Sequence, residues 1–250
     1  IGLPTSTIIA SSNYKVVGYD IKPKIINTIK KGKAHFNEKN LNQILKQVID
    51  SGKLRASEFI ESAEIFIITV PTPLDKKINS VIPKPDISFV LDAAKKIAEV
   101  IKAEDLVIIE STCPVGTTKK VQSLIEKYSV IKKEDFYLAC CPERVIPGNI
   151  LNEIKFNDRV IGGVDKKSSE KARDFYSNFC LGKLLITDSK TAELVKLTEN
   201  SYRDVNIAFA NELSIICDKL EINVWELIGL ANRHPRVDIL QPGPGVGGHC

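Results

Sequence analysis

The stretch Leu106–Gly116 (LVIIESTCPVG) contains the pattern that decides the fold. Its first four residues carry large aliphatic side chains, which is typical of a strand buried on both faces of a parallel sheet. Glu110 ends the strand, and small hydroxyl side chains follow it before the turn at Gly116. An apolar strand that leads into such a polar turn predicts one unit of an alternating strand–helix fold.

The same alternation recurs from the first residues to about residue 187. The predicted strands, which are rich in valine, isoleucine and leucine, are Lys15–Tyr19, Ile65–Val70, Leu106–Glu110, Phe136–Cys140, Arg159–Ile161 and Leu184–Thr187. Amphipathic helices are predicted between them, for example at Ser88–Ile101 and Ser168–Phe179. This alternation favours an α/β fold with a doubly wound, mostly parallel, Rossmann-like sheet.

The pattern changes after Asp188, where apolar residues recur at intervals of three and four positions. These residues are Ala192, Val195, Tyr202, Val205, Phe209, Leu213, Ile216 and Leu220. Their spacing predicts one helix of about 30 residues, far longer than the usual length of about 12. A helix of that length usually bridges domains or packs against a partner subunit. We therefore expect one domain at residues 1–187, a central helical or dimerisation domain at residues 188–250, and a homodimer or higher homo-oligomer.

The composition argues against several classes of protein. The net charge of +4 is small and scattered, so neither nucleic acid nor an anionic membrane surface is an expected partner. No apolar run approaches the roughly 18 residues that a membrane helix needs. The six cysteines lack paired metal-ligand spacing. We therefore expect no metal, no disulfide framework and a cytoplasmic location.

Gly2 and Asp20 match two positions of a nucleotide-binding strand–helix–strand unit. A glycine turn at Ile1 and Gly2 enters a helix, and Asp20 closes the strand that follows. An acidic residue about 20 positions after the glycine turn accepts hydrogen bonds from the adenosine ribose. A carboxylate there also repels a 2′-phosphate, which favours NAD over NADP. The alternative is an ordinary turn glycine and an ordinary residue at a strand end.

Hydroxyl side chains follow two of the predicted strands. Thr72 lies in a Pro-Thr-Pro turn after Val70, and Thr112 follows Glu110. Ligands of open α/β sheets bind at the carboxyl ends of the strands, so both threonines are candidates for contact with a cofactor or substrate. Ordinary turn chemistry would place the same residue types there.

Charged side chains follow a further predicted strand. Glu143 and Arg144 come soon after Cys140. A carboxylate at this edge of the sheet suits acid–base work, and a guanidinium suits contact with phosphate. The alternative is a surface ion pair.

The long helix carries a separate polar stripe. Lys196 and Asn200 are four residues apart and share one face, Arg203 lies one turn further, and Asn211 returns to roughly the same side. A lysine and an amide on one face suit a substrate oxygen and an oxyanion. A solvated helix face would show the same spacing.

Residues 241–250 (QPGPGVGGHC) form the most informative segment. Its glycines and prolines predict a loop whose backbone presses closely against a ligand. A cysteine in such a loop, beside a histidine, is placed for nucleophilic attack, although a lone cysteine is usually structural. His234 and Arg236 suit a diphosphate, or alternatively interact with the dipole at a helix end.

Together these residues resemble the UDP-glucose/GDP-mannose dehydrogenase family. The specific match is residues 231–236 (ANRHPR) followed by residues 241–250, and residues 110–116, residues 142–145 and the Lys196/Asn200 pair agree with it. The resemblance spans the whole chain and is greatest to members that act on UDP-N-acetyl-D-mannosamine. It implies an NAD-dependent, four-electron oxidation of the C6 alcohol of a UDP-sugar to the uronate.

The resemblance also implies roles for the candidate residues. Cys250 would form a thiohemiacetal and then a thioester, which water hydrolyses. Lys196 and Asn200 would hold the sugar oxygen. Thr112 would contact the cofactor or position water, and Glu143 would assist hydrolysis. The implied cofactor-binding residues are Ile1, Gly2, Asp20, Thr72 and Thr112. The implied substrate-binding residues are Arg144, Val145, Lys196, Asn200, Arg203, His234, Arg236 and Gly247, with Arg236 reaching across a dimer interface.

Two alternative functions stay open at this point. A β-hydroxyacid dehydrogenase also carries a Lys-x-x-x-Asn pair on a long helix, but it stops after one hydride transfer and leaves the Gly-Gly-His-Cys loop unexplained. A non-catalytic module that binds NAD or dimerises is the other.

The two ends of the chain lead to a further expectation. The chain contains no methionine. The family's first strand, its first two fingerprint glycines, an aspartate after the cysteine and a C-terminal domain have no counterpart in it. We therefore expect further residues at both ends, and little oxidation of UDP-N-acetyl-D-mannosamine by these 250 residues alone.

Overall fold

The computed structural model describes residues 1–75 and 83–246, and contacts within the chain define two units, Ile1–Leu194 and Val195–Cys250. The first unit contains all the strands of the described residues. The second contains most of the long helix and a shorter helix. The domain boundary expected near residue 187 stays a prediction.

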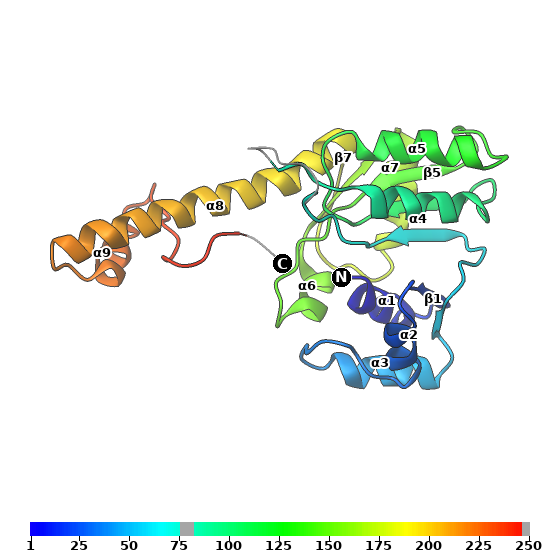
Figure 1. Ribbon diagram of the computed structural model, residues 1–250, viewed down its shortest axis with the longest axis horizontal. Coiled ribbons are helices and arrows are strands. Elements are labelled where there is room, and N and C mark those ends of the chain that lie inside the picture. Colours follow the sequence, from blue (N-terminus) through cyan, green and yellow to red (C-terminus); the bar gives the residue numbers. More distant parts are fainter. Residues whose placement is uncertain (76–82, 247–250) are drawn as a thin grey trace. The chain divides into compact units, whose positions relative to one another are not determined.

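The first unit contains two sheets (Figure 1). The smaller sheet pairs β1 (Val16–Tyr19) with β2 (Leu54–Ser57) in parallel, with Val16 opposite Leu54. The larger sheet has the order β3-β4-β5-β6-β7, from Ile65–Ile68, Leu106–Ile109, Tyr137–Cys140, Arg159–Gly163 and Leu184–Asp188. Its neighbouring strands are parallel except β5 and β6, which are antiparallel. The predicted mostly parallel α/β fold is confirmed.

Helices connect the strands of the first unit. They are α1 (Gly2–Ser11), α2 (Pro23–Lys30), α3 (Leu41–Asp50), α4 (Ser88–Ala98), α5 (Thr117–Tyr128), α6 (Ile150–Phe156) and α7 (Lys166–Tyr176). The second unit carries α9 (Val224–Ala231), and α8 (Ser189–Lys219) runs from the first unit into it. The predicted long helix is confirmed, since α8 has 31 residues.

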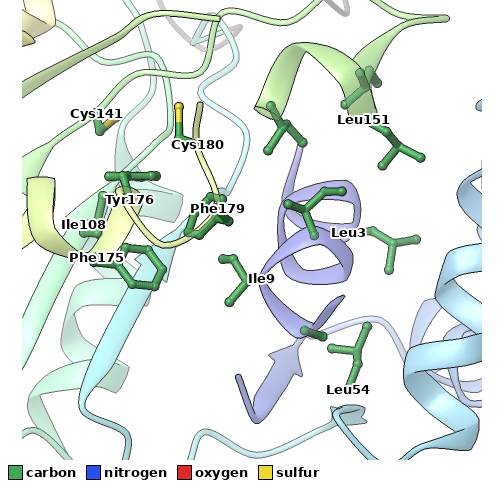
Figure 2. Packing of buried hydrophobic residues seen from close by; sticks show 14 of the residues in the cluster. Leu3, Ile9, Leu54, Ile108, Cys141, Leu151, Phe175, Tyr176, Phe179 and Cys180 are labelled. Carbon is green, nitrogen blue, oxygen red and sulfur yellow. The ribbon is translucent and has the colours of Figure 1, made fainter. Parts of the chain in front are cut away.

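The side chains of β4 show why helices lie on both faces of the larger sheet. Leu106 and Ile108 belong to one buried cluster, with residues of α1, α6 and α7. Val107 and Ile109 belong to a second cluster, with residues of α4 and α5. Alternate residues of a strand point to opposite faces, so a strand with no polar position requires cover on both. Figure 2 shows the first cluster, where Ile108 lies near Phe175 and Tyr176 of α7.

Local signals fix where several helices begin. Pro23 occupies the first turn of α2, where its missing N–H group costs no hydrogen bond. Asp165 caps α7 by accepting from Ser168 N at 2.7 Å. Asn223 caps α9 by accepting from Trp225 N at 2.9 Å. Such caps satisfy the first free N–H groups of a helix.

The described ranges set limits on two kinds of feature. None of the helices in residues 1–75 and 83–246 is both long enough and apolar enough to span a membrane. The same residues contain no group of three or more His, Cys, Asp and Glu side chains arranged to hold a metal ion.

Candidate functional site

The loops that follow β3 and β4 are joined at the carboxyl edge of the larger sheet. The Thr72 hydroxyl donates to the Thr112 carbonyl oxygen at 2.6 Å. The Ser111 hydroxyl donates to the Val70 carbonyl oxygen at 2.7 Å. The structure thus brings together the two threonines that the sequence nominated for cofactor contact. This edge is where ligands of open α/β sheets bind.

The amino end of α1 lies against the end of β3. A Cβ atom added to Gly2 would stand 2.5 Å from the Thr69 hydroxyl oxygen, so no larger residue fits at this approach. Ile1 directly precedes α1. The first turn of α1 contains no acidic side chain. The free N–H groups and the dipole of a helix amino end favour an anion such as a diphosphate. Binding of a dinucleotide by Ile1 and Gly2 stays a prediction.

Asp20 follows β1 in the smaller sheet. Its carboxylate accepts from Lys22 N at 2.8 Å, which holds the turn into α2. His35 is close enough for the two charges to interact: burial lowers the pKa of His35 below its ordinary value, and Asp20 opposes that shift. The predicted ribose-binding carboxylate thus stands at a strand end.

A cluster of charged side chains lies beneath the ends of β4 and β5, and we call Glu110, Glu143, Arg159 and Tyr176 the buried charge network. Arg159, from β6, donates from Nη2 to Glu143 Oε2 at 3.1 Å, and its Nη1 lies 3.6 Å from Glu110 Oε1. The Tyr176 hydroxyl donates to Glu110 Oε1 at 2.7 Å. The guanidinium carbon of Arg159 lies 4.6 Å from the centre of the Tyr176 ring. The Arg159 guanidinium therefore forms ion pairs with both Glu110 and Glu143.

Burial governs the titration of this network. Glu110 is fully buried, and its pKa is raised from the ordinary value of 4.5 to about 7, mainly by burial and then by the charge of Glu143, against the opposing effect of Arg159. Within the described residues, Glu110 Oε2 and Arg159 Nε have no hydrogen-bond partner. Burial also raises the pKa of the Cys141 thiol to about 12, which makes that thiol a poor nucleophile.

The two predicted substrate-binding residues after Glu143 have partners within their own unit. Arg144 N donates to Glu143 Oε1 at 2.8 Å, and the Arg144 guanidinium donates to the Asp158 carbonyl oxygen. Val145 is buried in the first hydrophobic cluster. These contacts fix the segment that carries Glu143. Contact of Arg144 with a substrate phosphate stays a prediction.

Glu193, which the sequence did not single out, holds the loop after β4. Its carboxylate accepts from Gly116 N at 2.6 Å, Thr118 N at 2.7 Å and the Thr118 hydroxyl at 2.6 Å. It thereby satisfies N–H groups at the amino end of α5 and fixes the far end of the loop that contains Thr112. A carboxylate near the start of the long helix was the available signal, but its partners lie more than 70 residues earlier in the chain.

The second unit carries the other predicted catalytic residues. Lys196 and Asn200 of α8 are half-buried, and Arg203 is exposed. His234 and Arg236, after α9, are exposed, and His234 Nδ1 accepts from Arg236 N at 3.3 Å. Gly247 and Cys250 lie outside the described residues.

The loop that leads toward Cys250 is fastened by three side chains of the second unit, and we call Asp204, Asn211 and Asn232 the loop latch. Asn211 accepts from Gly243 N at 2.8 Å and donates to the Gly243 carbonyl at 2.9 Å. Asn232 makes the same pair of bonds with Ile239, at 2.8 and 2.9 Å. Asp204 accepts from Val246 N at 2.8 Å. The sequence placed Asn211 on the polar stripe but missed the other two.

The arrangement of this chain, a Rossmann-like unit followed by a long helix, is similar to that of a class of dehydrogenases. Residues 1–180 match the NAD binding domain of the UDP-glucose/GDP-mannose dehydrogenase family, and residues 190–250 match its central domain. The chain therefore belongs to the UDP-glucose/GDP-mannose dehydrogenase family, as the sequence motifs predicted.

Several relatives are similar along the whole chain. A UDP-N-acetyl-D-mannosamine dehydrogenase of Campylobacter jejuni is 51% identical over 100% of this chain and 62% of its own length. An NDP-N-acetyl-D-galactosaminuronic acid dehydrogenase of Ralstonia nicotianae is 49% identical over 100% of this chain and 60% of its own. The solved UDP-D-ManNAc dehydrogenase of Pyrococcus horikoshii has a TM-score of 0.94 at 46% identity, over 100% of this chain and 59% of its own. The chain thus spans about 60% of the length of these relatives.

Proposed function

We propose that this chain supplies the NAD-binding and central domains of a nucleotide-sugar 6-dehydrogenase. The proposed reaction oxidises the C6 alcohol of UDP-N-acetyl-D-mannosamine to the carboxylate of UDP-N-acetyl-D-mannosaminuronate. The observation that carries the proposal is the 51% identity, over the whole chain, to a relative named for that sugar. The joined loops at the ends of β3 and β4 support it, because they place candidate cofactor contacts at the edge where such folds bind ligands.

The residues present fit NAD. Ile1 and Gly2 would receive the diphosphate at the amino end of α1, Asp20 the adenosine ribose, and Thr72 and Thr112 the nicotinamide end. The first turn of α1 carries no acidic side chain, which supports this assignment because a carboxylate there would repel a diphosphate. NAD, when bound, accepts a hydride in each of two oxidations.

We assign the chemistry between the two oxidations to Cys250. The C6 alcohol loses a hydride and a proton and becomes an aldehyde, to which the thiol adds. The resulting thiohemiacetal loses a second hydride and becomes a thioester, and water then releases the carboxylate and the thiol. Lys196 and Asn200 would hold the sugar oxygen and its developing negative charge. Glu143 would assist attack by water, which Thr112 would help to position.

The family motifs also assign residues to the UDP-sugar substrate. Arg144, Arg203, His234 and Arg236 supply positive or polar groups suited to a diphosphate, and backbone and apolar contact would come from Val145 and Gly247. This assignment rests on residue types and on the family motifs. Alanine replacement of Arg236 is expected to raise KM for the UDP-sugar more than for NAD.

The test is a count of NADH formed per sugar, using the protein that carries this chain and a panel of UDP-sugars. Two NADH per UDP-N-acetyl-D-mannosamine, and loss of activity in C250S, would support the proposal. One NADH per substrate, or full activity in C250S, would instead favour a single-step β-hydroxyacid dehydrogenase. Faster turnover of a UDP-N-acetylgalactosamine substrate would change the proposed substrate to that sugar. A relative at 49% identity is named for galactosaminuronic acid.

We also propose that α8 packs against a second copy of the chain. Apolar side chains are exposed along it: Tyr202, Val205, Phe209 and Ile216 are each at least 50% exposed. Burial of such a stripe is the usual reason for a long helix at a subunit interface. Light scattering on the eluting protein should give at least twice the chain mass, and a monomer would contradict this proposal.

A further inference from the structure

The loop of residues 111–116, between β4 and α5, is fastened at its first end to the loop that follows β3. The Ser111 hydroxyl donates to the Val70 carbonyl oxygen at 2.7 Å. The Thr112 carbonyl oxygen accepts from the Thr72 hydroxyl at 2.6 Å. These bonds hold the backbone of Thr112 on one side. The position of its side chain therefore also depends on how the loop ends.

The far end of the same loop is held by the carboxylate of Glu193, near the start of α8. This side chain lies within the first unit, and the residue is only 2% exposed. Its Oε2 accepts from Gly116 N at 2.6 Å, and its Oε1 accepts from the N–H and the hydroxyl of Thr118 at 2.7 and 2.6 Å. Gly116 has a φ of +94°, in the left-handed region. Glu193 thus holds the loop where its backbone makes an unusual turn.

The arrangement around Glu193 requires a carboxylate. Three donors converge on its two oxygens. An ionised carboxylate accepts at both oxygens, whereas a glutamine amide has one acceptor oxygen and one donor group. In either orientation, a glutamine would direct an N–H group at another donor. A neutral residue of the same shape therefore cannot hold Gly116 and Thr118 together.

From this geometry we propose that Glu193 is a positioning residue for the contact between Thr112 and the nicotinamide end of the cofactor. Only four positions separate Thr112 from Gly116, and the loop between them contains the buried Cys113 and the stiff ring of Pro114. A displacement of Gly116 is therefore passed along the loop to Thr112. The proposal rests on the cofactor role proposed above for Thr112.

The test compares NAD with ADP-ribose, which lacks the nicotinamide, in the protein that carries this chain. Calorimetric titration gives the Kd of each without turnover. We expect E193Q to weaken NAD about fivefold, which is the order of effect that loss of one hydrogen bond produces. The Kd of ADP-ribose is expected to change less than about twofold. Hydrogen exchange at the Gly116 and Thr118 amides should become faster, because both donate to the carboxylate.

G116A tests the same end of the loop with Glu193 intact. A Cβ atom at this position would meet nothing within 4 Å, so the change acts through the left-handed backbone alone. We expect the same selective loss of NAD affinity. G52A is the matched control, because Gly52 has a φ of +70° and is equally open, in the turn before β2. It carries similar strain, and parent affinity for both ligands is expected.

The outcomes distinguish this inference from the proposed function. T112V is expected to show the same selective loss of NAD affinity. If it does, while E193Q and G116A bind NAD like the parent, the positioning role is overturned and the cofactor role of Thr112 stands. If E193Q weakens NAD and ADP-ribose equally, Glu193 supports the fold in general and the inference fails. If T112V binds both ligands like the parent, the cofactor role of Thr112 falls, and this inference with it.

Discussion

The buried charge network and the loop latch hold candidate functional segments by different physical means. In the network, Glu110 and Arg159 are 0% and 4% exposed, and the partners are other buried side chains. In the latch, Asp204 is exposed, Asn211 and Asn232 are half-buried, and the partners are backbone groups of a loop. Each lies within its own unit of the chain.

The two arrangements should respond differently to the loss of one side chain. A charge removed from water depends on every partner, so loss of one member leaves an uncompensated charge in the core. A backbone group at a half-exposed surface exchanges its lost partner for water at a small net cost. Damage to the network should therefore lower the stability of the fold, whereas damage to the latch should displace a segment with little loss of stability. The predictions below test this contrast.

Arg159→Met should have the largest effect. It leaves Glu110 and Glu143 in the core without their shared cation, and we expect the free energy of unfolding to fall by about 3–5 kcal/mol. Urea denaturation at pH 7 measures it. Arg173→Met is the control, because Arg173 pairs with its neighbour Asp174 at the surface, and its denaturation midpoint should match the parent. A loss below about 1 kcal/mol for Arg159→Met would show that the network is not electrostatically interdependent.

Glu110→Gln should change how stability depends on pH. The pKa of Glu110 is raised to about 7 in the folded state from an ordinary 4.5, so the folded state binds the proton more tightly than the unfolded state. The contribution is fully present below pH 4.5 and is lost as pH rises through about 7. The free energy of unfolding of the variant, minus that of the parent, should therefore rise by about 3 kcal/mol across this window. Urea titrations at several pH values measure it, and a constant difference would contradict the assignment.

Asn211→Ala should have a smaller and more local effect. It removes both bonds to Gly243, and we expect the local free energy of opening to fall by about 1–2 kcal/mol. Hydrogen exchange of the Gly243 amide measures this directly. Asn206→Ala is the matched control, because the Asn206 side chain donates to Tyr202 O of its own helix. If the two variants exchange alike at Gly243, the latch does not hold the loop.

The sequence predicted the elements that are long or uniformly apolar. β4 and α8 follow directly from their side-chain patterns, and the strand ends placed Thr72 and Thr112 at one edge. β2 was missed because Leu54–Ser57 is short and half polar, and its pairing with β1 supplies the stability that its own residues lack. The antiparallel pairing of β5 with β6 was also missed, because strand composition does not encode direction.

Partners distant in the chain explain what the sequence did not predict at the candidate site. Arg159 was placed in a strand and Glu110 at a strand end, but 49 residues separate them, and only the folded sheet brings them together. A charged residue at the edge of an apolar run was the available signal. Asp204 had a stronger signal, four residues after Asn200 on the polar stripe. Its partner Val246 lies 42 residues later, in a loop without periodicity.

The same carboxylate-to-amide change at Asp204 should have the smallest effect and separates the two regions most sharply. Asp204→Asn keeps an oxygen that accepts from Val246 N and removes only the charge. A bond to an ionised acceptor is about twice as strong as a neutral one, so we expect a local loss below about 1 kcal/mol. Hydrogen exchange of the Val246 amide measures it, with Asp204→Ala as the larger reference. At Glu110 the charge is the property that matters, because water is excluded and one guanidinium is shared. At Asp204 the acceptor is what matters, because water surrounds it. If Asp204→Asn frees Val246 as fully as Asp204→Ala, the latch is an electrostatic device like the network, and the contrast between the two regions fails.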